Sequence, residues 1–261
     1  MLNILRGGLD PSKIPIDVRT RCYIHDDMLA SIPIENRSEK LIPVVWSSIL
    51  VEPFWEDAPI LTGDSELDHI LMSESKLLLQ YKLEHDDFDV LVRVEVLERL
   101  KISQEYFSHY WYQLVLKVGY RPISVQRTLF EEIAEYYQKK FPNHSPLDIE
   151  EMAMQMVAHP DKTIPPHSTG GAVDVLLRNS STGEVIDMGS PINMPDDTSH
   201  LIVPGLPNYA LSNRNILLNG MLAGWFANLP SEWWHFSYGD AYWAVFYGYE
   251  KALYTSISEE E

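Results

Sequence analysis

The sequence has a single cysteine, Cys22, and few basic residues. One cysteine cannot form an internal disulfide, so nothing indicates an oxidising compartment, and no further signal supports Cys22 as a nucleophile. The 20 Lys and Arg residues face 38 Asp and Glu residues, which gives a formal net charge of -18. This charge argues against binding to nucleic acid or to an anionic membrane surface. We interpret the acidity as a source of solubility.

The sequence also lacks long apolar segments. Its N-terminus has no basic start followed by an apolar run, so it does not read as a signal peptide. No stretch approaches the roughly 18 apolar residues that a membrane-spanning helix needs. Phosphate loops, dinucleotide-binding fingerprints and cysteine-based zinc patterns are missing as well. We therefore expect a cytoplasmic protein without membrane insertion.

Hydrophobic residues make up 45% of the chain, enough for a sizeable core. Apolar spacing predicts helices over residues 66–83, 89–108, 124–140, 146–157 and 213–228. Alternation predicts strands over 44–50, 112–118 and 233–238, and a hairpin that pairs 172–177 with 184–188. Residues 241–254 fit either a strand or a helix. No internal repeat or low-complexity linker divides these elements.

Two short motifs contain residues of the types that bind metals in proteins. One is His167-Ser-Thr-Gly-Gly-Ala-Val-Asp174, and the other is Glu232-Trp-Trp-His235. Two imidazoles and one carboxylate suit a catalytic zinc, whose fourth position stays open for water, and a nearby carboxylate can take the proton of that water. Each half alone also fits a half-buried strand with one polar side chain. Together they favour a metallohydrolase with one Zn²⁺, although this ligand set discriminates weakly among divalent metals.

These motifs resemble the D-alanyl-D-alanine dipeptidases of the vancomycin-resistance type, which are zinc peptidases related to the D,D-carboxypeptidases. The family signature is S-x-H-x-x-G-x-A-x-D followed by E-x-W-H. The resemblance covers roughly residues 87–250. Further segments that agree with the family are Gly119-Tyr-Arg-Pro122, Asp187-Met-Gly189, Asn213-Arg214 and Gly224-Trp-Phe226 before Pro230.

The resemblance implies a role for each residue of the motifs. His167, Asp174 and His235 would be the zinc ligands. Glu232 would be the general base, and Arg121 the cation that stabilises the developing oxyanion. An arginine suits that role because its guanidinium does not lose its proton.

Two departures from the family pattern concern the pocket more than the metal. Pro165 stands where the family has Ser, and it offers neither a hydroxyl nor an N–H. Ile192-Asn193 follows the Asp-Met-Gly segment, where the family tends to have Phe-Asp. The candidate substrate contacts are Ser168, Tyr120 and Trp234. The loop over residues 191–207 is a candidate lid, and its His200 could approach the pocket.

We expect an α+β fold in which a small antiparallel sheet carries the zinc site and helices pack on one side. Residues 1–86 would form an N-terminal elaboration of the same compact unit, and residues 87–261 the zinc peptidase catalytic domain. The expected function is hydrolysis of D-Ala-D-Ala or a similar short dipeptide, and thus cell-wall (peptidoglycan) metabolism. The expected partner is a small peptide substrate, and the sequence leaves the oligomeric state open.

Two alternatives remain open at this point. Pro165 motivates a D,D-carboxypeptidase or cell-wall endopeptidase that uses the same zinc site. The divergent residues 1–86 motivate a non-catalytic, zinc-binding regulatory protein.

Overall fold

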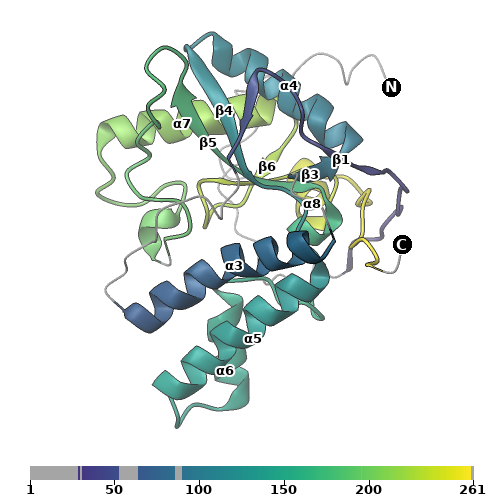
Figure 1. Cartoon of the computed structure of the whole chain (residues 1–261), viewed down its shortest axis with the longest axis vertical. Helices are drawn as coiled ribbons and strands as arrows, with labels where there is room; N and C mark the ends of the chain where they lie inside the picture. The colour runs from purple at the N-terminus through teal and green to yellow at the C-terminus, as the bar shows by residue number, and fades with distance from the viewer. Residues whose placement is uncertain (1–28, 30, 53–63, 86–89, 195, 260–261) are drawn as a thin grey trace.

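A computed structural model describes residues 29, 31–52, 64–85, 90–194 and 196–259 (Figure 1). Cys22 lies outside these residues. The helices are α3 (Ser65–Glu84), α4 (Val94–Ser108), α5 (Ile123–Lys140), α6 (Pro146–Met154), α7 (Asn208–Ala223) and α8 (Ala241–Tyr247). The strands are β1 (Leu41–Pro43), β2 (Ile49–Val51), β3 (Leu91–Arg93), β4 (Tyr112–Val118), β5 (Ala172–Asn179), β6 (Ala227–Asn228) and β7 (His235–Ser237). Short 3₁₀ helices, η3 (Pro166–Thr169) and η4 (Asp197–Ser199), complete the description.

A five-stranded sheet in the order β2-β4-β5-β7-β6 forms the centre of the molecule. The pairs β4–β5, β5–β7 and β6–β7 are antiparallel, as the sequence predicts. The edge strand β2 instead runs parallel to β4. This difference arises because α3, β3 and α4 lie between the two strands in the chain, and such a long connection permits a parallel return. The predicted α+β class is confirmed.

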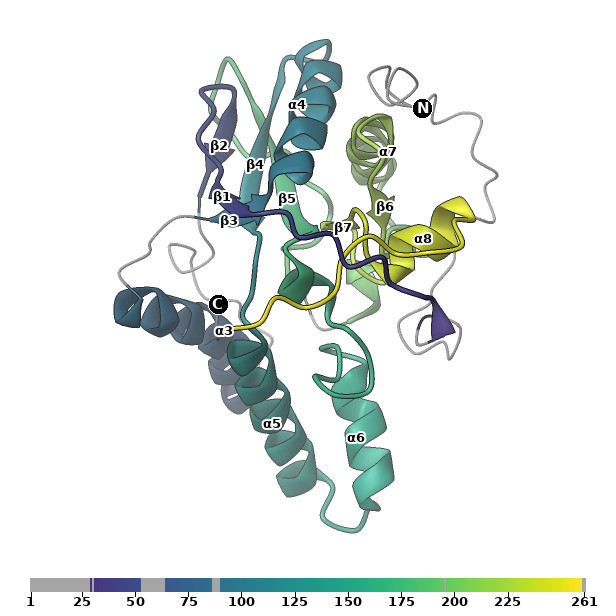
Figure 2. The same cartoon turned by 90° about the vertical axis from the view of Figure 1, so that its right-hand side faces the viewer.

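The helices form two groups around the sheet. Helices α4 and α7 pack against each other on one side of it, as Figure 2 shows. Their core with the sheet contains fully buried side chains such as Phe107, Leu114 and Met221. Helices α3, α5 and α6 form the second group, which has its own apolar cluster around Ile133 and Tyr136. No helix in the described part of the chain is long and apolar enough to cross a membrane.

Several element boundaries differ from the sequence prediction. Of the predicted strand over 44–50, only Ile49 and Leu50 are extended, in β2, and a turn separates them from β1, which ends at Pro43. Helix α4 begins at Val94, because residues 91–93 pair with β1. Helix α5 begins directly after Pro122 and not at a Ser124 cap, since the proline already holds the extended ψ of a helix N-cap. Helix α7 begins at Asn208, five residues before the predicted start.

The predicted hairpin after β5 forms only in part. Asn179 closes the turn by accepting hydrogen bonds from two backbone N–H groups through its side chain, and Gly183 has a φ of 76°. The returning chain makes one isolated bridge, between Arg178 and Val185, and no regular strand. Helix α6 begins with a reciprocal capping box formed by Ser145 and Asp148.

The described strands of the N-terminal segment pair with later parts of the chain. Strand β1 pairs with β3, β2 extends the central sheet, and the backbone near Ile34 bridges to Ala252 close to the C-terminus.

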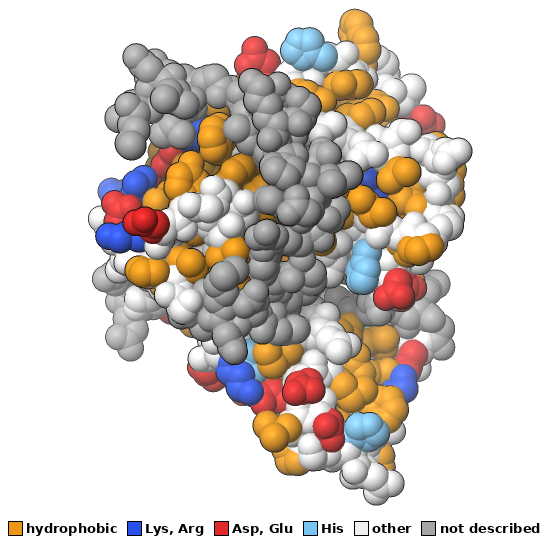
Figure 3. All heavy atoms as spheres, turned by 180° about the vertical axis from the view of Figure 1, so that it is seen from behind, with side chains coloured by type: hydrophobic (Ala, Val, Ile, Leu, Met, Phe, Trp, Pro, Cys, Tyr) orange, Lys and Arg blue, Asp and Glu red, His pale blue; other side chains and the backbone are white. Residues whose placement is uncertain are grey.

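On the described part of the face in Figure 3, basic side chains are scattered among acidic ones. A continuous basic surface of the kind that binds nucleic acid is therefore not seen there.

Candidate metal centre and active site

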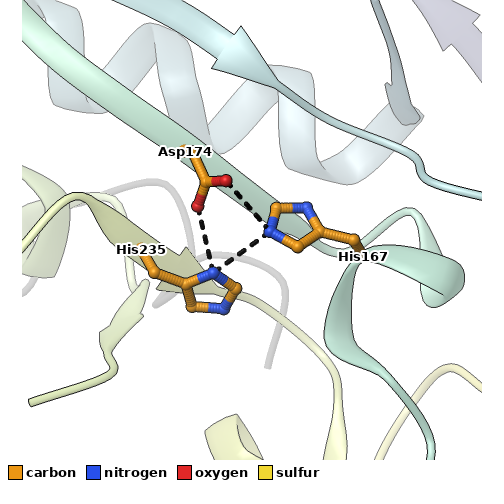
Figure 4. A group of neighbouring side chains, drawn as sticks. All are labelled: His167, Asp174 and His235. Carbon is orange, nitrogen blue, oxygen red and sulfur yellow. Dashed lines mark hydrogen bonds and ion pairs between the residues drawn. The ribbon is translucent and has the colours of Figure 1, made fainter. Parts of the chain in front are cut away.

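The sheet brings the two sequence motifs together. In the register of β5 and β7, Asp174 lies directly opposite His235. His167 lies on the 3₁₀ helix η3 just before β5, and Gly170 ends that helix with a φ of 70°. This left-handed conformation suits glycine and turns the chain back so that β5 can begin beside His167. Three segments thus place their side chains at one end of the sheet, as Figure 4 shows.

The three side chains meet at one point. His167 Nε2 lies 3.1 Å from His235 Nδ1 and 3.3 Å from Asp174 Oδ2, and His235 Nδ1 lies 3.0 Å from Asp174 Oδ1. Zinc–nitrogen bonds of about 2.0–2.1 Å would place tetrahedral donors about 3.3 Å apart. The spacing of the donors therefore fits a zinc ion, and all three residues are buried.

Neighbouring groups orient both imidazoles. His167 Nδ1 lies 2.8 Å from the carbonyl oxygen of Gly119, so this nitrogen carries the proton and Nε2 is left to bind a metal. His235 presents Nδ1 to the centre, and its Nε2 lies 3.4 Å from Ser237 Oγ. Contacts of this kind fix the ring planes of metal ligands and raise their basicity.

The protonation states of His167 and Asp174 suit a bound cation, whereas His235 must lose a proton before it can bind one. Burial lowers the pKa of His167, which keeps its ring neutral. Burial also disfavours the charge of Asp174, but the two histidines outweigh it and hold the pKa of Asp174 below its usual range. Burial opposes charge on His235 too, yet the hydrogen bond to Asp174 prevails and raises the pKa of His235. A neutral imidazole and an ionised carboxylate are the forms that bind metals.

Glu232 lies at the mouth of this centre. The turns around it bring its carboxylate 3.8 Å from His235 Nδ1, with 28% of the side chain exposed. Burial among its neighbours, together with the charge of Asp174, raises the pKa of Glu232 to about 7. A carboxylate with a pKa near neutrality can both accept and return a proton. Glu232 and His235 are three residues apart in the sequence, and the turns at residues 230–234 bring both into the site.

Arg121 lines the same pocket. Its backbone N–H donates to the carbonyl of His167 at 3.1 Å, and its Nη1 donates to Gln126 Oε1 at 2.8 Å. Its Nη2 forms an ion pair with Glu74 of α3. Arg121 and Glu74 are both buried.

A cavity of about 950 Å³ connects these groups. Glu74, Arg121, Glu232 and the three candidate ligands line it, together with Trp234 and Pro165. The candidate lid contributes Asn193 and His200 to the lining. The cavity has one strongly polar side near the metal centre and an apolar side that includes Ile133 and Leu129.

Two of the candidate substrate contacts lie elsewhere among the described residues. Ser168 is buried, its hydroxyl donates to the carbonyl of Pro165 at 2.7 Å, and it lies 2.6 Å from Ser256 Oγ. Tyr120 is buried and bonds to β3 through its backbone N–H, 2.7 Å from the oxygen of Leu91. Neither residue lines the cavity. The next residue along from a pocket residue commonly points away from it, which accounts for both positions.

Glu74 and Gln126 contact Arg121 but are not among the site residues predicted from the sequence. A signal for Glu74 was present: in α3 it follows Ile70 by four residues and precedes Leu78 by four, so it lies on the inner stripe. A charged residue on an inner stripe needs a partner, and Arg121 is that partner. For Gln126 the sequence gives no comparable signal.

Comparison with known proteins identifies relatives along most of the chain. A family described as D-ala-D-ala dipeptidase matches residues 79–255. A D-alanyl-D-alanine dipeptidase of Synechocystis is 30% identical over 184 residues, which is 59% of this chain and 71% of that protein. The D-alanyl-D-alanine dipeptidase of Enterococcus faecalis is 29% identical, over 52% of this chain and 67% of the relative. A solved structure, the vancomycin-resistance D,D-pentapeptidase VanY in complex with Zn(II), is 14% identical with a TM-score of 0.34, covering 62% of this chain and 82% of that one.

Proposed function

Because this chain belongs to the D-ala-D-ala dipeptidase family, we propose that it is a zinc peptidase that hydrolyses D-Ala-D-Ala or a similar short dipeptide. The observation that carries the proposal is the meeting of three buried donors, His167, Asp174 and His235, beside the carboxylate of Glu232. Three protein ligands with an adjacent base are the arrangement of a catalytic zinc site rather than of a closed structural one.

The three donors would hold one zinc ion. When bound, zinc would lower the pKa of water toward neutrality and polarise the scissile carbonyl. Glu232 would take the proton of the attacking water, for which its pKa of about 7 is well matched, and would pass it to the leaving amine. Arg121 would donate N–H groups to the oxyanion that forms at the former carbonyl. Trp234, which is buried and lines the cavity, would limit the access of further water.

The test is the isosteric variant Glu232→Gln, measured with zinc in excess. We expect zinc content and thermal stability close to those of the wild type, and turnover of D-Ala-D-Ala lower by about 10²–10⁴-fold. The matched control is Glu84→Gln on the exposed end of α3, which should keep full activity. Full activity of Glu232→Gln with zinc bound would refute the assignment of the base.

A second function, D,D-carboxypeptidase or cell-wall endopeptidase activity at the same centre, is favoured by the size of the cavity. At about 950 Å³ it lies at the upper end of the volumes typical of small-molecule pockets, and it exceeds what a dipeptide needs. Pro165 lines it and offers neither a hydroxyl nor an N–H to a substrate terminus.

Paired substrates decide between the two functions. Turnover should be measured for D-Ala-D-Ala and for an N-acylated peptide that ends in D-Ala-D-Ala. A dipeptidase rejects the blocked amine, whereas a carboxypeptidase accepts it. Failure to release alanine from any member of a stereochemically complete dipeptide panel, or from the acylated peptide, would instead indicate a zinc-binding regulatory protein.

A further inference from the structure

Glu74 enters the pocket from an element that the family match does not fully include. Helix α3 spans Ser65–Glu84, whereas the matched region begins at residue 79. The helix packs against α5, and Figure 2 shows the two lying together below the sheet. Glu74 is 6% exposed and lines the cavity beside Arg121. A helix that begins before the matched region thus supplies a buried carboxylate to the proposed active site.

The carboxylate of Glu74 is one of two anchors of the Arg121 guanidinium. Glu74 pairs with Nη2, and Gln126 Oε1 accepts from Nη1 at 2.8 Å. Gln126 is itself fixed, because its Nε2 donates to the carbonyl of Ala158 at 2.7 Å. Each of Nη1 and Nη2 carries two N–H groups, so one N–H on each nitrogen is left for an oxyanion.

Charge gives a second reason for the contact. Arg121 is 7% exposed, and a buried guanidinium without a counter-charge costs several kcal/mol. Glu232, the proposed base, is one of the other carboxylates that line the pocket, and the charge of Arg121 acts on it. An Arg121–Glu232 pair would occupy both the oxyanion donor and the base. The contact with Glu74 keeps the two groups apart.

We propose that Glu74 is a positioning residue of the active site, which holds the guanidinium of Arg121 toward the reacting carbonyl and away from Glu232. The inference rests on the proposed function, since it assigns Arg121 to the oxyanion. Displacing a catalytic group by about 1 Å can lower the rate by about 10²-fold. Loss of Glu74 should therefore lower kcat and affect substrate binding little.

The experiment is a double-mutant cycle on the zinc-loaded full chain with D-Ala-D-Ala as substrate. Glu74→Ala should lower kcat by about 10–100-fold with KM changed less than about threefold, and Glu74→Gln, which keeps an acceptor oxygen, should lose less. In an Arg121→Met background, Glu74→Ala should have no further effect on kcat, because the residue acts through Arg121. Glu84→Gln on the same helix is the control, and thermal unfolding and zinc content verify that each variant folds.

Three results would overturn the inference. One is wild-type kcat in folded Glu74→Ala, and another is an equal loss with and without Arg121, which a purely structural role predicts. The third is a rise in KM for D-Ala-D-Ala that is absent for the N-acylated peptide, which would make Glu74 a binding group for the substrate ammonium. Wild-type turnover and Glu232→Gln report on the proposed function by themselves. Only the Glu74 variants, compared with the wild type, report on this inference.

Discussion

Arg214 on α7 offers a direct test of how the wall of the pocket is held. It is 1% exposed, and no ion pair with a carboxylate is found for it among the residues that the structure describes. Its Nε donates to the carbonyl of Met188 at 2.7 Å, its Nη1 to that of His200, and its Nη2 to Thr198 O at 2.8 Å and Ser190 Oγ at 3.1 Å. Burial lowers the pKa of Arg214 to about 10, so the side chain still carries its charge at pH 7.

The substitution Arg214→Met keeps an unbranched side chain and removes every donor. Hydrogen bonds from a charged donor contribute about 1.5–3 kcal/mol each, but they are not additive, and the desolvation of the guanidinium offsets part of the sum. Loss of a buried network of this kind typically costs about 3–5 kcal/mol. At about 2–4 °C per kcal/mol, the unfolding midpoint should fall by about 6–20 °C.

The assay is thermal and urea unfolding with zinc present, together with hydrogen exchange over residues 188–200. We expect faster exchange in this loop and a higher KM for D-Ala-D-Ala, because Asn193 and His200 of the loop line the cavity. The matched control is Arg127→Met, which removes an exposed arginine paired with Asp161 and should change stability little. A loss below about 1 kcal/mol in Arg214→Met, or an equal loss in the control, would refute the reasoning.

Three further predictions concern the metal centre and the core. Asp174→Asn should reduce zinc affinity by more than the 10–100-fold typical of outer-shell partners, and metal analysis after dialysis measures it. Zinc affinity should weaken by roughly tenfold for each pH unit below the pKa of His235, because the protonated ring cannot bind metal. The hydrogen bond to Asp174 raises that pKa. A dissociation constant for zinc that is independent of pH between 6 and 8 would contradict this prediction. Gly220→Ala should destabilise the protein by about 1–3 kcal/mol in urea unfolding, because the added Cβ would lie 2.1 Å from the ring of Phe107. This loss should exceed the gain from the better helix propensity of alanine. Unchanged stability would show that the ring can move aside.

Local patterns in the sequence predicted the existence of the main elements. Strand β4 begins and ends at the predicted residues, but it is buried on both faces from Leu114 to Val118, because helices and neighbouring segments cover both sides. The boundaries that differ depend on distant partners. Leu91–Arg93 extends as a strand because β1 pairs with it, and no feature of residues 89–94 announces that pairing. The parallel edge strand β2 is likewise a consequence of tertiary pairing.

The candidate site was predictable where chemistry is concentrated in short motifs. His167, Asp174, Glu232 and His235 are close in two motifs, and the structure places all four at one point. The substrate contacts were less predictable, because a side chain one position from a pocket residue can point into the core, as that of Ser168 does. The partner of Arg121 was not predicted, since no motif links a helix in the divergent N-terminal part to the strand end at residue 121.

Several contacts cross the boundary that the sequence analysis places at residue 86. Residues before this point supply β2 to the central sheet and Glu74 to the pocket, so both the sheet and Arg121 have partners on the N-terminal side. The C-terminal segment contributes as well, through the bridge between Ile34 and Ala252. An independent domain would keep its hydrogen-bonded strands and buried charge pairs within itself. We therefore infer that the N-terminal elaboration and the catalytic part fold as one unit, and that a change in α3 acts on the site through Arg121.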